Sequence, residues 1–157
     1  MVRQQVGDLL EVEYEGKFYY IVVLTKVVMF GGNIVFAFHT DGTQQQLDSL
    51  LPLADGFNIC TDLLLPKREE TVRRLSKIED TAPFWRTKLF KQTMTRVPGA
   101  KAIEWFIFEV EAPTDCIARI SEMPKKCREA MDYGTSSFDL TAKKILSRYT
   151  PDQNEHL

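Results

Sequence analysis

Hydrophobic and polar residues alternate clearly near the start of the chain. From Asp8 to Tyr14 the apolar residues Leu10, Val12 and Tyr14 alternate with glutamates, which predicts a strand with two different faces. A tight turn at Glu15-Gly16-Lys17 then leads into an apolar second strand from Phe18 to about Val28. Gly31-Gly32-Asn33 turns the chain into a third strand, Ile34 to His39. We therefore expect an antiparallel meander over about residues 8–39.

The pattern after the meander predicts shorter elements. We expect a short helix over Gln44–Leu51, a strand over Phe57–Leu65 and another strand over Cys116–Ile120. The segment Lys67–Glu79 is ambiguous, but its apolar residues repeat every three positions, as in a short helix. Phe84–Val97 and Ala102–Glu111 flank Pro98-Gly99 and predict a second hairpin over about residues 84–111. Apolar residues on both faces from Ile103 to Val110 indicate a central, covered strand.

The C-terminal part predicts helices over about residues 124–149. Pro124 suits the first turn of a helix that extends to Met131. The last helix is expected to be capped by Ser136 or Ser137, to carry Phe138, Ala142, Ile145 and Tyr149 on one face, and to end before Pro151. The polar tail that follows is expected to be frayed. Together the patterns predict an α+β fold, an antiparallel meander in a partly barrel-like sheet with a C-terminal helical segment.

Length and composition restrict the class of protein. The 157 residues fit a single domain, 1–157, and the apolar fraction of 44% is that of a globular chain. The net charge of −2 argues against a strongly basic nucleic-acid surface. No apolar run reaches the roughly 20 residues of a membrane-spanning helix, and the N-terminus lacks a signal peptide. We expect a cytoplasmic protein without a membrane partner, whose three cysteines are reduced.

Several kinds of site chemistry find little support in the sequence. The cysteines, Cys60, Cys116 and Cys127, are too widely spaced for a zinc site and fit a packed core better, so no metal and no cofactor are expected. Gly31-Gly32-Asn33 joins two strands and is not a phosphate loop. His39 could act as a general base for Cys60, although a histidine at the end of a strand is the simpler interpretation. His156 is expected to be exposed. We therefore do not expect an enzyme.

Charged residues provide two candidate binding surfaces. A basic stretch surrounds Trp85 and could hold single-stranded nucleic acid, or it could be a solvated face that neutralises acidic neighbours. It consists of Lys67, Arg68, Arg73, Arg74, Lys77, Arg86, Lys88, Lys91 and Arg96. The carboxylates of the two hairpins could be a solvated sheet face, or an acidic docking surface for a basic protein. The candidate partner-binding residues are Glu11, Glu13, Glu15, Asp41, Glu109 and Glu111.

The N-terminal meander also resembles a known group of proteins. The stretch VGDLLEVEYEGKFYYIVVLTKV, followed by IVFAFHTDG, looks like the N-terminal strands of some immunity proteins of bacterial polymorphic and contact-dependent toxin systems. The resemblance implies an inhibitor that binds and neutralises a cognate toxin domain, for example a nuclease with a basic cleft. A protein of this kind needs a rigid scaffold and a complementary surface, and no catalytic residues.

Overall fold

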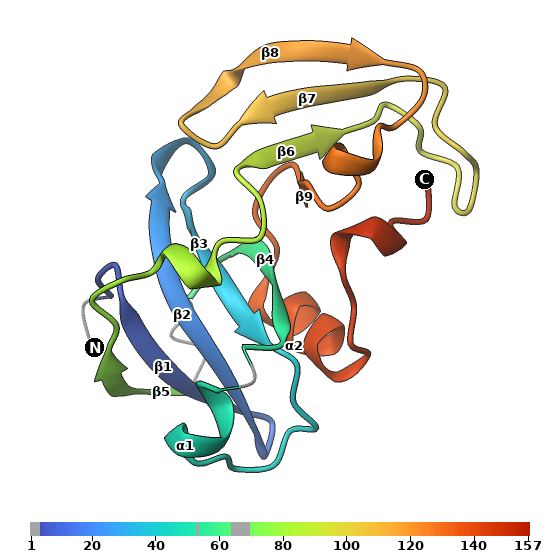
Figure 1. The fold of residues 1–157 in the computed structure, drawn as a ribbon. Helices are drawn as coiled ribbons and strands as arrows, with labels where there is room; N and C mark the ends of the chain where they lie inside the picture. Colours follow the sequence, from blue (N-terminus) through green and yellow to red (C-terminus); the bar gives the residue numbers. More distant parts are fainter. Residues whose placement is uncertain (1–3, 53, 64–69) are drawn as a thin grey trace. The chain divides into compact units, whose positions relative to one another are not determined.

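The computed structural model describes residues 4–52, 54–63 and 70–157 (Figure 1). The chain forms two compact units. Unit 1 is Met1–Trp85 with Thr135–Tyr149, and unit 2 is Arg86–Gly134 with Thr150–Leu157. The α+β class is confirmed, because both units are built on mainly antiparallel sheets and a helix follows near the C-terminus. The expectation of one domain stays a prediction.

Unit 1 contains a five-stranded antiparallel sheet in the order β4-β3-β2-β1-β5. Its strands are β1 (Asp8–Tyr14), β2 (Lys17–Val27), β3 (Gly32–Phe38), β4 (Gly56–Thr61) and β5 (Glu70–Lys77). The meander expected from the sequence is confirmed. Its fourth strand continues the meander, and β5 returns to pair with β1, as in a partly barrel-like sheet. Short helices connect the strands: η1 (Val28–Phe30), α1 (Leu47–Leu50) and η2 (Ala82–Phe84).

The first hairpin turns at the residues that the sequence indicated. Tyr14 pairs with Lys17, so Glu15 and Gly16 are the two turn residues. Both have positive φ, 49° for Glu15 and 74° for Gly16. Two left-handed residues give a turn whose twist matches that of the flanking strands. This geometry places the exposed Glu15 side chain at the tip of the hairpin.

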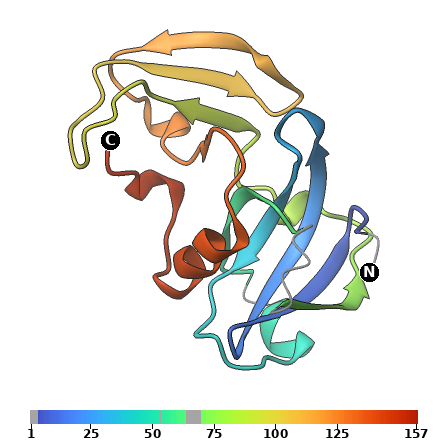
Figure 2. The ribbon, with the colours of Figure 1, turned by 180° about the vertical axis from the view of Figure 1, so that it is seen from behind.

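Helix α2 (Phe138–Leu146) covers one face of the sheet and lies against β4 (Figures 1 and 2). Ser137 caps the helix by accepting a hydrogen bond from the Leu140 N–H at 3.3 Å, as one of the two predicted caps. Phe138, Ala142 and Ile145 are buried, which confirms most of the predicted apolar face. They join a core cluster contributed by alternating residues of the strands: Leu10, Val12, Tyr14, Tyr19, Ile21, Val23, Val35, Ala37, Phe57, Ile59 and Leu63.

The helix suggested for Lys67–Glu79 is wrong over the described part of that segment. Residues 70–77 form β5, and residues 67–69 lie outside the described residues. The register places Arg73 opposite Glu11 and Lys77 opposite Asp8. Cross-strand pairs of opposite charge stabilise a sheet. Pairing with the acidic strand β1 therefore decides the conformation of residues 70–77, and the helical three-residue repeat does not.

Unit 2 contains a four-stranded sheet in the order β8-β7-β6-β9. Its strands are β6 (Leu89–Gln92), β7 (Trp105–Glu109), β8 (Ala112–Ile120) and β9 (Met131–Asp132). β6 and β7 form the predicted second hairpin, and β7 is central in the sheet, as expected. Ile103 is an exception, because it precedes β7 and is 87% exposed. β9 is the parallel strand of this sheet.

The helix predicted from Pro124 to Met131 is wrong. Only a short 3-10 turn, η3 (Lys125–Cys127), forms there, and the chain then enters β9. The buried Lys91 explains this, because its ammonium donates to the carbonyls of Arg128 at 2.9 Å and Ala130 at 2.5 Å. In a continuing helix these carbonyls would accept backbone N–H groups of the following turn instead.

The tail is packed into unit 2, and the expectation of fraying is wrong. It begins with a 3-10 turn, η4 (Pro151–Gln153). Asn154 Nδ2 then donates to Asp132 Oδ1 at 2.7 Å, and the Ala102 N–H donates to the His156 carbonyl at 2.9 Å. The His156 side chain is 13% exposed, so it is not the solvent-exposed group that the sequence suggested.

Candidate functional site

Exposed carboxylates gather where the β1–β2 hairpin turns. Glu13 is near the end of β1, Glu15 is in the turn, and both are exposed. The loop after β3 lies beside them, because the Phe18 N–H donates to the Gly42 carbonyl at 2.9 Å. That loop carries the exposed Asp41. We call Glu13, Glu15, Asp41 and Asp139 the acidic end of unit 1.

Asp139 belongs to the acidic end through its contact with Tyr14. It lies in the first turn of α2, where a carboxylate is favoured by the helix dipole. The Tyr14 hydroxyl donates to Asp139 Oδ1 at 3.2 Å. Asp139 was not among the carboxylates that the sequence offered as partner-binding candidates. Its proximity to the hairpin depends on how α2 packs on the sheet, which local patterns do not reveal.

The electrostatics of Tyr14 and Tyr19 show that Glu15 and Asp139 act on the same small region. Burial, with the negative charges of Asp139 and Glu15, raises the pKa of Tyr14 to about 12. The pKa of Tyr19 is raised by the same three causes. Lysines offset part of this charge: Lys143 pairs with Asp139 at 2.8 Å, and the exposed Lys17 lies against Gly42. The region therefore carries four carboxylates and two lysines, of which Lys143 forms an ion pair.

Asp41 is held in a fixed conformation by its own loop. Its Oδ1 accepts hydrogen bonds from the Thr43 N–H at 3.0 Å and from the Thr43 hydroxyl at 2.6 Å. These hydrogen bonds lower the pKa of Asp41, so the group is a carboxylate at neutral pH. An oriented, charged side chain loses little conformational freedom when a partner binds.

Glu11 is not part of an exposed face, in contrast to the prediction. It is 5% exposed, accepts from the Tyr20 hydroxyl at 2.9 Å and pairs with Arg73 at 2.8 Å. Alternation placed Glu11 on the face opposite the α2-covered core, and this is correct. On that face the carboxylate of Glu11 is covered by two cross-strand neighbours, Tyr20 on β2 and Arg73 on β5. Glu11 is therefore a structural residue of unit 1.

Asp8 is a second buried carboxylate that sequence reasoning missed. It is fully buried and accepts from the Gln5 N–H at 2.8 Å, from Arg74 at 2.9 Å and from Lys77 at 3.3 Å. Burial alone would raise the pKa of Asp8, but these three partners outweigh it and the pKa is lowered. The sequence feature that could have indicated this contact is the opposite charge of the acidic segment 8–13 and the basic segment 73–77, which pair as β1 and β5.

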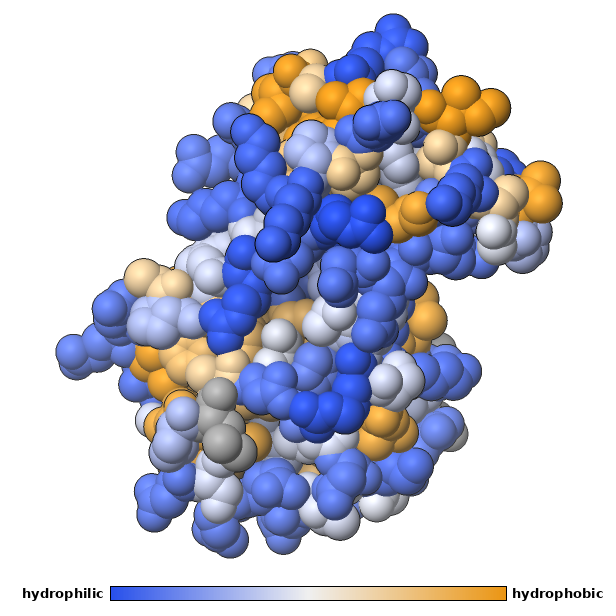
Figure 3. Space-filling model, turned by 45° about the vertical axis from the view of Figure 1, so that its right-hand side comes forward, coloured by the Kyte–Doolittle hydropathy of each residue, from blue (hydrophilic) through white to orange (hydrophobic). Residues whose placement is uncertain are grey.

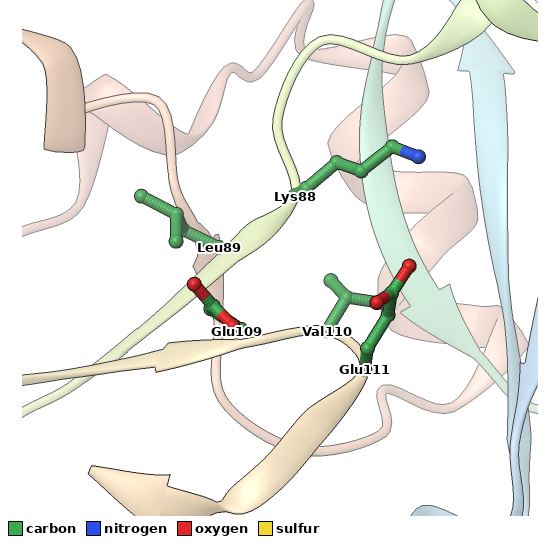
Figure 4. Close-up of a pocket in the computed structure, with 5 residues that line it drawn as sticks. All are labelled: Lys88, Leu89, Glu109, Val110 and Glu111. Atoms are coloured by element: carbon green, nitrogen blue, oxygen red, sulfur yellow. The ribbon is translucent and has the colours of Figure 1, made fainter. Parts of the chain in front are cut away.

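Glu109 and Glu111 belong to unit 2, where they are exposed beside the β7–β8 turn. With Lys88, Leu89 and Val110 they line a shallow hollow of about 230 Å³ (Figure 4). The Val110 N–H donates to the Lys88 carbonyl at 3.0 Å and joins two of these lining residues. Figure 4 shows that Lys88 and Glu111 extend to one side and Glu109 to the other.

The basic stretch is not one continuous cationic surface. Arg73 pairs with Glu11, and Arg74 and Lys77 pair with Asp8. Lys91 is 1% exposed. Arg86, Lys88 and Arg96 are exposed on unit 2, while Lys67 and Arg68 lie outside the described residues. Four of the basic residues therefore stabilise the fold, which removes much of the basis for nucleic-acid binding through this stretch.

His39 and Cys60 do not form a catalytic pair. His39 follows Phe38, which pairs with Gly56, whereas Cys60 pairs with Ile34. Five residue steps separate them along the strands, about 16 Å at 3.3 Å per residue. His39 Nδ1 and Nε2 contact Asp55 and the Tyr149 carbonyl, while the Cys60 thiol contacts Thr135. Burial raises the pKa of Cys60, which lowers its reactivity as a nucleophile.

The cysteines form no metal site in the described part of the chain. Cys60 and Cys127 are buried, but Cys116 is exposed, so the expectation of a packed Cys116 is wrong. Among the described residues, no three His, Cys, Asp or Glu side chains lie together in a group that could hold a metal ion. None of the described helices is long and apolar enough to cross a membrane.

Comparison with known proteins gives no relative. No protein-family model matches the sequence, and no curated protein or solved structure is significantly similar to the chain.

Proposed function

We propose that the chain is a protein-binding inhibitor, an immunity protein that binds and neutralises a cognate bacterial toxin domain. The observation that carries this proposal is the acidic end of unit 1, where Glu13, Glu15, Asp41 and Asp139 surround the turn of one hairpin, Glu13 on the face opposite α2 and Asp139 on the α2 side. The N-terminal meander, which resembles that of some immunity proteins, supports the same function. A toxin nuclease has a basic cleft for phosphates, and an acidic surface can compete for such a cleft.

The construction of the acidic end suits a docking surface. Its residues come from β1, the β1–β2 turn, the loop after β3 and α2, all of which are fixed by the core of unit 1. Binding by a rigid surface costs less conformational entropy than binding by mobile loops. Excess negative charge also accelerates the encounter with a basic partner.

The proposed surface differs from the one that the sequence suggested. Glu11 is excluded by its burial, and Asp139 is added. Glu109 and Glu111 stay candidates for a second contact group on unit 2. On the face drawn in Figure 3, blue hydrophilic residues cover most of the surface and orange apolar residues lie in separate patches. Scattered apolar residues are normal for a protein surface, so charge is the more informative feature.

Co-expression tests this function directly. The chain is expressed with the C-terminal toxin domain encoded beside it in its genome, and purified through a tag on the toxin. We expect a stable complex and loss of the toxin's activity at equimolar inhibitor. A neighbouring toxin that neither binds the chain nor loses activity would contradict the proposal.

A further inference from the structure

Unit 1 contains a cavity whose lining, unlike the acidic end, carries charges of both signs. It measures about 420 Å³ and lies between the loop after β3, α1, the segment before β4 and the segment after α2. Phe38 and Leu50, which are 2% and 4% exposed, form its apolar part. The polar lining includes His39, Thr40, Asp41, Ser49, Asp55 and Arg148. The volume falls in the range of small-molecule sites, about 300–1,000 Å³.

An ionic network fixes one wall of the cavity. His39 Nδ1 lies 3.1 Å from Asp55 Oδ1, and His39 Nε2 lies 2.8 Å from the Tyr149 carbonyl oxygen. Both partners are acceptors only, so both ring nitrogens donate when the imidazole is protonated. Arg148 donates to the other oxygen of Asp55. Hydrogen bonds from His39, with those from Arg148, lower the pKa of Asp55 despite its partial burial.

The backbone around this wall is strained. Ala54 and Arg148 have φ of 37° and 55°, in the left-handed region that non-glycine residues rarely adopt. Together with the hairpin residue Glu15 they are the positive-φ residues other than glycine among the described positions. Such strain persists where the surrounding structure enforces it, and it is enriched at ligand-binding sites. Here it places Asp55 and Arg148 side by side.

The cavity contains hydrogen-bonding groups that the fold does not use. Thr40 Oγ1 is buried and has no hydrogen-bond partner among the described residues. A buried hydroxyl without a partner is costly and rare in folded proteins. In the described part of the chain, Asp41 accepts its side-chain hydrogen bonds through Oδ1. Arg148 donates through Nη2, which leaves further N–H groups for a ligand.

We propose that this cavity binds a zwitterionic small molecule of the amino-acid class. Its carboxylate would pair with Arg148, its ammonium group with Asp41, and one polar atom would contact the Thr40 hydroxyl. The charges of the lining support a dipolar ligand, because the carboxylates of Asp41 and Asp55 and the guanidinium of Arg148 give the cavity separated charges of both signs. This binding is additional to the proposed inhibition of a toxin.

A titration with defined zwitterions tests the proposal without any toxin. ¹⁵N-labelled full-length protein is titrated with glycine, 4-aminobutanoate and 6-aminohexanoate, which separate the two charges by increasing distances. Butylamine and butyrate are the matched controls, since each carries one of the charges. We expect at least one zwitterion to shift the amide signals of Thr40, Asp41 and Ser49 at millimolar concentration, and each control to bind about tenfold more weakly. The proposal is overturned if no zwitterion shifts these signals at 20 mM, or if a control binds as tightly as the zwitterions.

Variants separate ligand binding from folding. D41N and R148Q should each weaken binding of the best zwitterion about tenfold, the effect of losing one charge-assisted hydrogen bond. T40V removes the unpartnered hydroxyl at nearly constant volume, so it should raise the thermal midpoint and still weaken binding. K126Q, an exposed change on unit 2, is the control and should alter neither. Unchanged affinity in D41N, R148Q and T40V would refute the assignment of these groups.

Discussion

Lys91 is the residue on which we expect the stability of unit 2 to depend most. Its side chain is fully buried, and its Nζ donates to the carbonyls of Arg128, Ala130 and Pro151 at 2.9, 2.5 and 2.7 Å. An ammonium group has three N–H donors, so all three are used. These bonds join β6 to the segment before β9 and to the C-terminal turn η4, and they link three separate parts of the unit.

The substitution K91M removes the charge and the donors but preserves most of the side-chain volume. It leaves carbonyl oxygens without their donor in the interior. The three orphaned carbonyls cost about 1–3 kcal/mol each, about 3–9 kcal/mol together. Removing the buried charge also relieves a desolvation cost, so we expect the lower half of this range, about 3–6 kcal/mol in the free energy of unfolding.

Urea unfolding followed by tryptophan fluorescence measures this loss. The two tryptophans are Trp85 in unit 1 and Trp105 in unit 2, and Trp105 is 3% exposed. In a W85F background the signal comes from Trp105 and so reports on unit 2. K126M is the matched control, because it makes the same chemical change at an exposed position of unit 2 and should cost under about 0.5 kcal/mol. A K91M cost below about 1 kcal/mol would refute the reasoning, since it would mean that the three hydrogen bonds contribute almost nothing net.

Three further predictions concern unit 1. E11Q should lower the free energy of unfolding, measured by thermal unfolding, by about 1–2 kcal/mol, because it weakens the contacts with Arg73 and Tyr20. The exposed E13Q should cost under about 0.5 kcal/mol in the same assay, and equal effects of the two variants would contradict the burial of Glu11. The lowered pKa of Asp8 contributes stability that is present above its unfolded pKa of about 3.9 and is lost as the pH falls through the folded value. The unfolding midpoint should therefore fall less steeply below about pH 4 in D8N, which lacks this carboxylate, than in the wild type. G56A should destabilise by roughly 2 kcal/mol or more, because an added Cβ would lie 2.1 Å from the Ala37 carbonyl oxygen, and an unchanged melting temperature would exclude that clash.

The fold could be predicted best where local patterns and pairing agree. The β1–β2–β3 meander, the β6–β7 hairpin and the cap and apolar face of α2 followed from alternation, turn residues and helical spacing. The failures have a common cause. The segments around Arg73 and Arg128 have helix-like patterns, but each is held by a distant partner. The Arg73 side chain pairs with Glu11, and the Arg128 carbonyl accepts a hydrogen bond from Lys91. Such long-range pairing is invisible to a local pattern.

In the candidate site, too, local patterns predicted some features, and long-range packing determined the others. Alternation correctly placed Glu11 and Glu13 on one face of β1, but it could not tell that the side chains of Arg73 and Tyr20 cover Glu11 and leave Glu13 exposed. Asp139 reaches the hairpin only because α2 folds back onto the sheet. The cavity beside Asp41 depends on strained residues, Ala54 and Arg148, whose conformations are not expected for alanine or arginine.

The most direct test of the account compares association kinetics with the co-encoded toxin domain at several salt concentrations. The variant E13K/E15K/D139K reverses three charges of the acidic end and spares the buried Glu11. The control E109K/E111K makes the same change on unit 2. If the acidic end is the main docking surface, the triple variant should lose most of its association rate and most of the salt dependence of that rate, and the control should retain the greater part of both. An association rate and salt dependence unchanged in the triple variant would contradict the account.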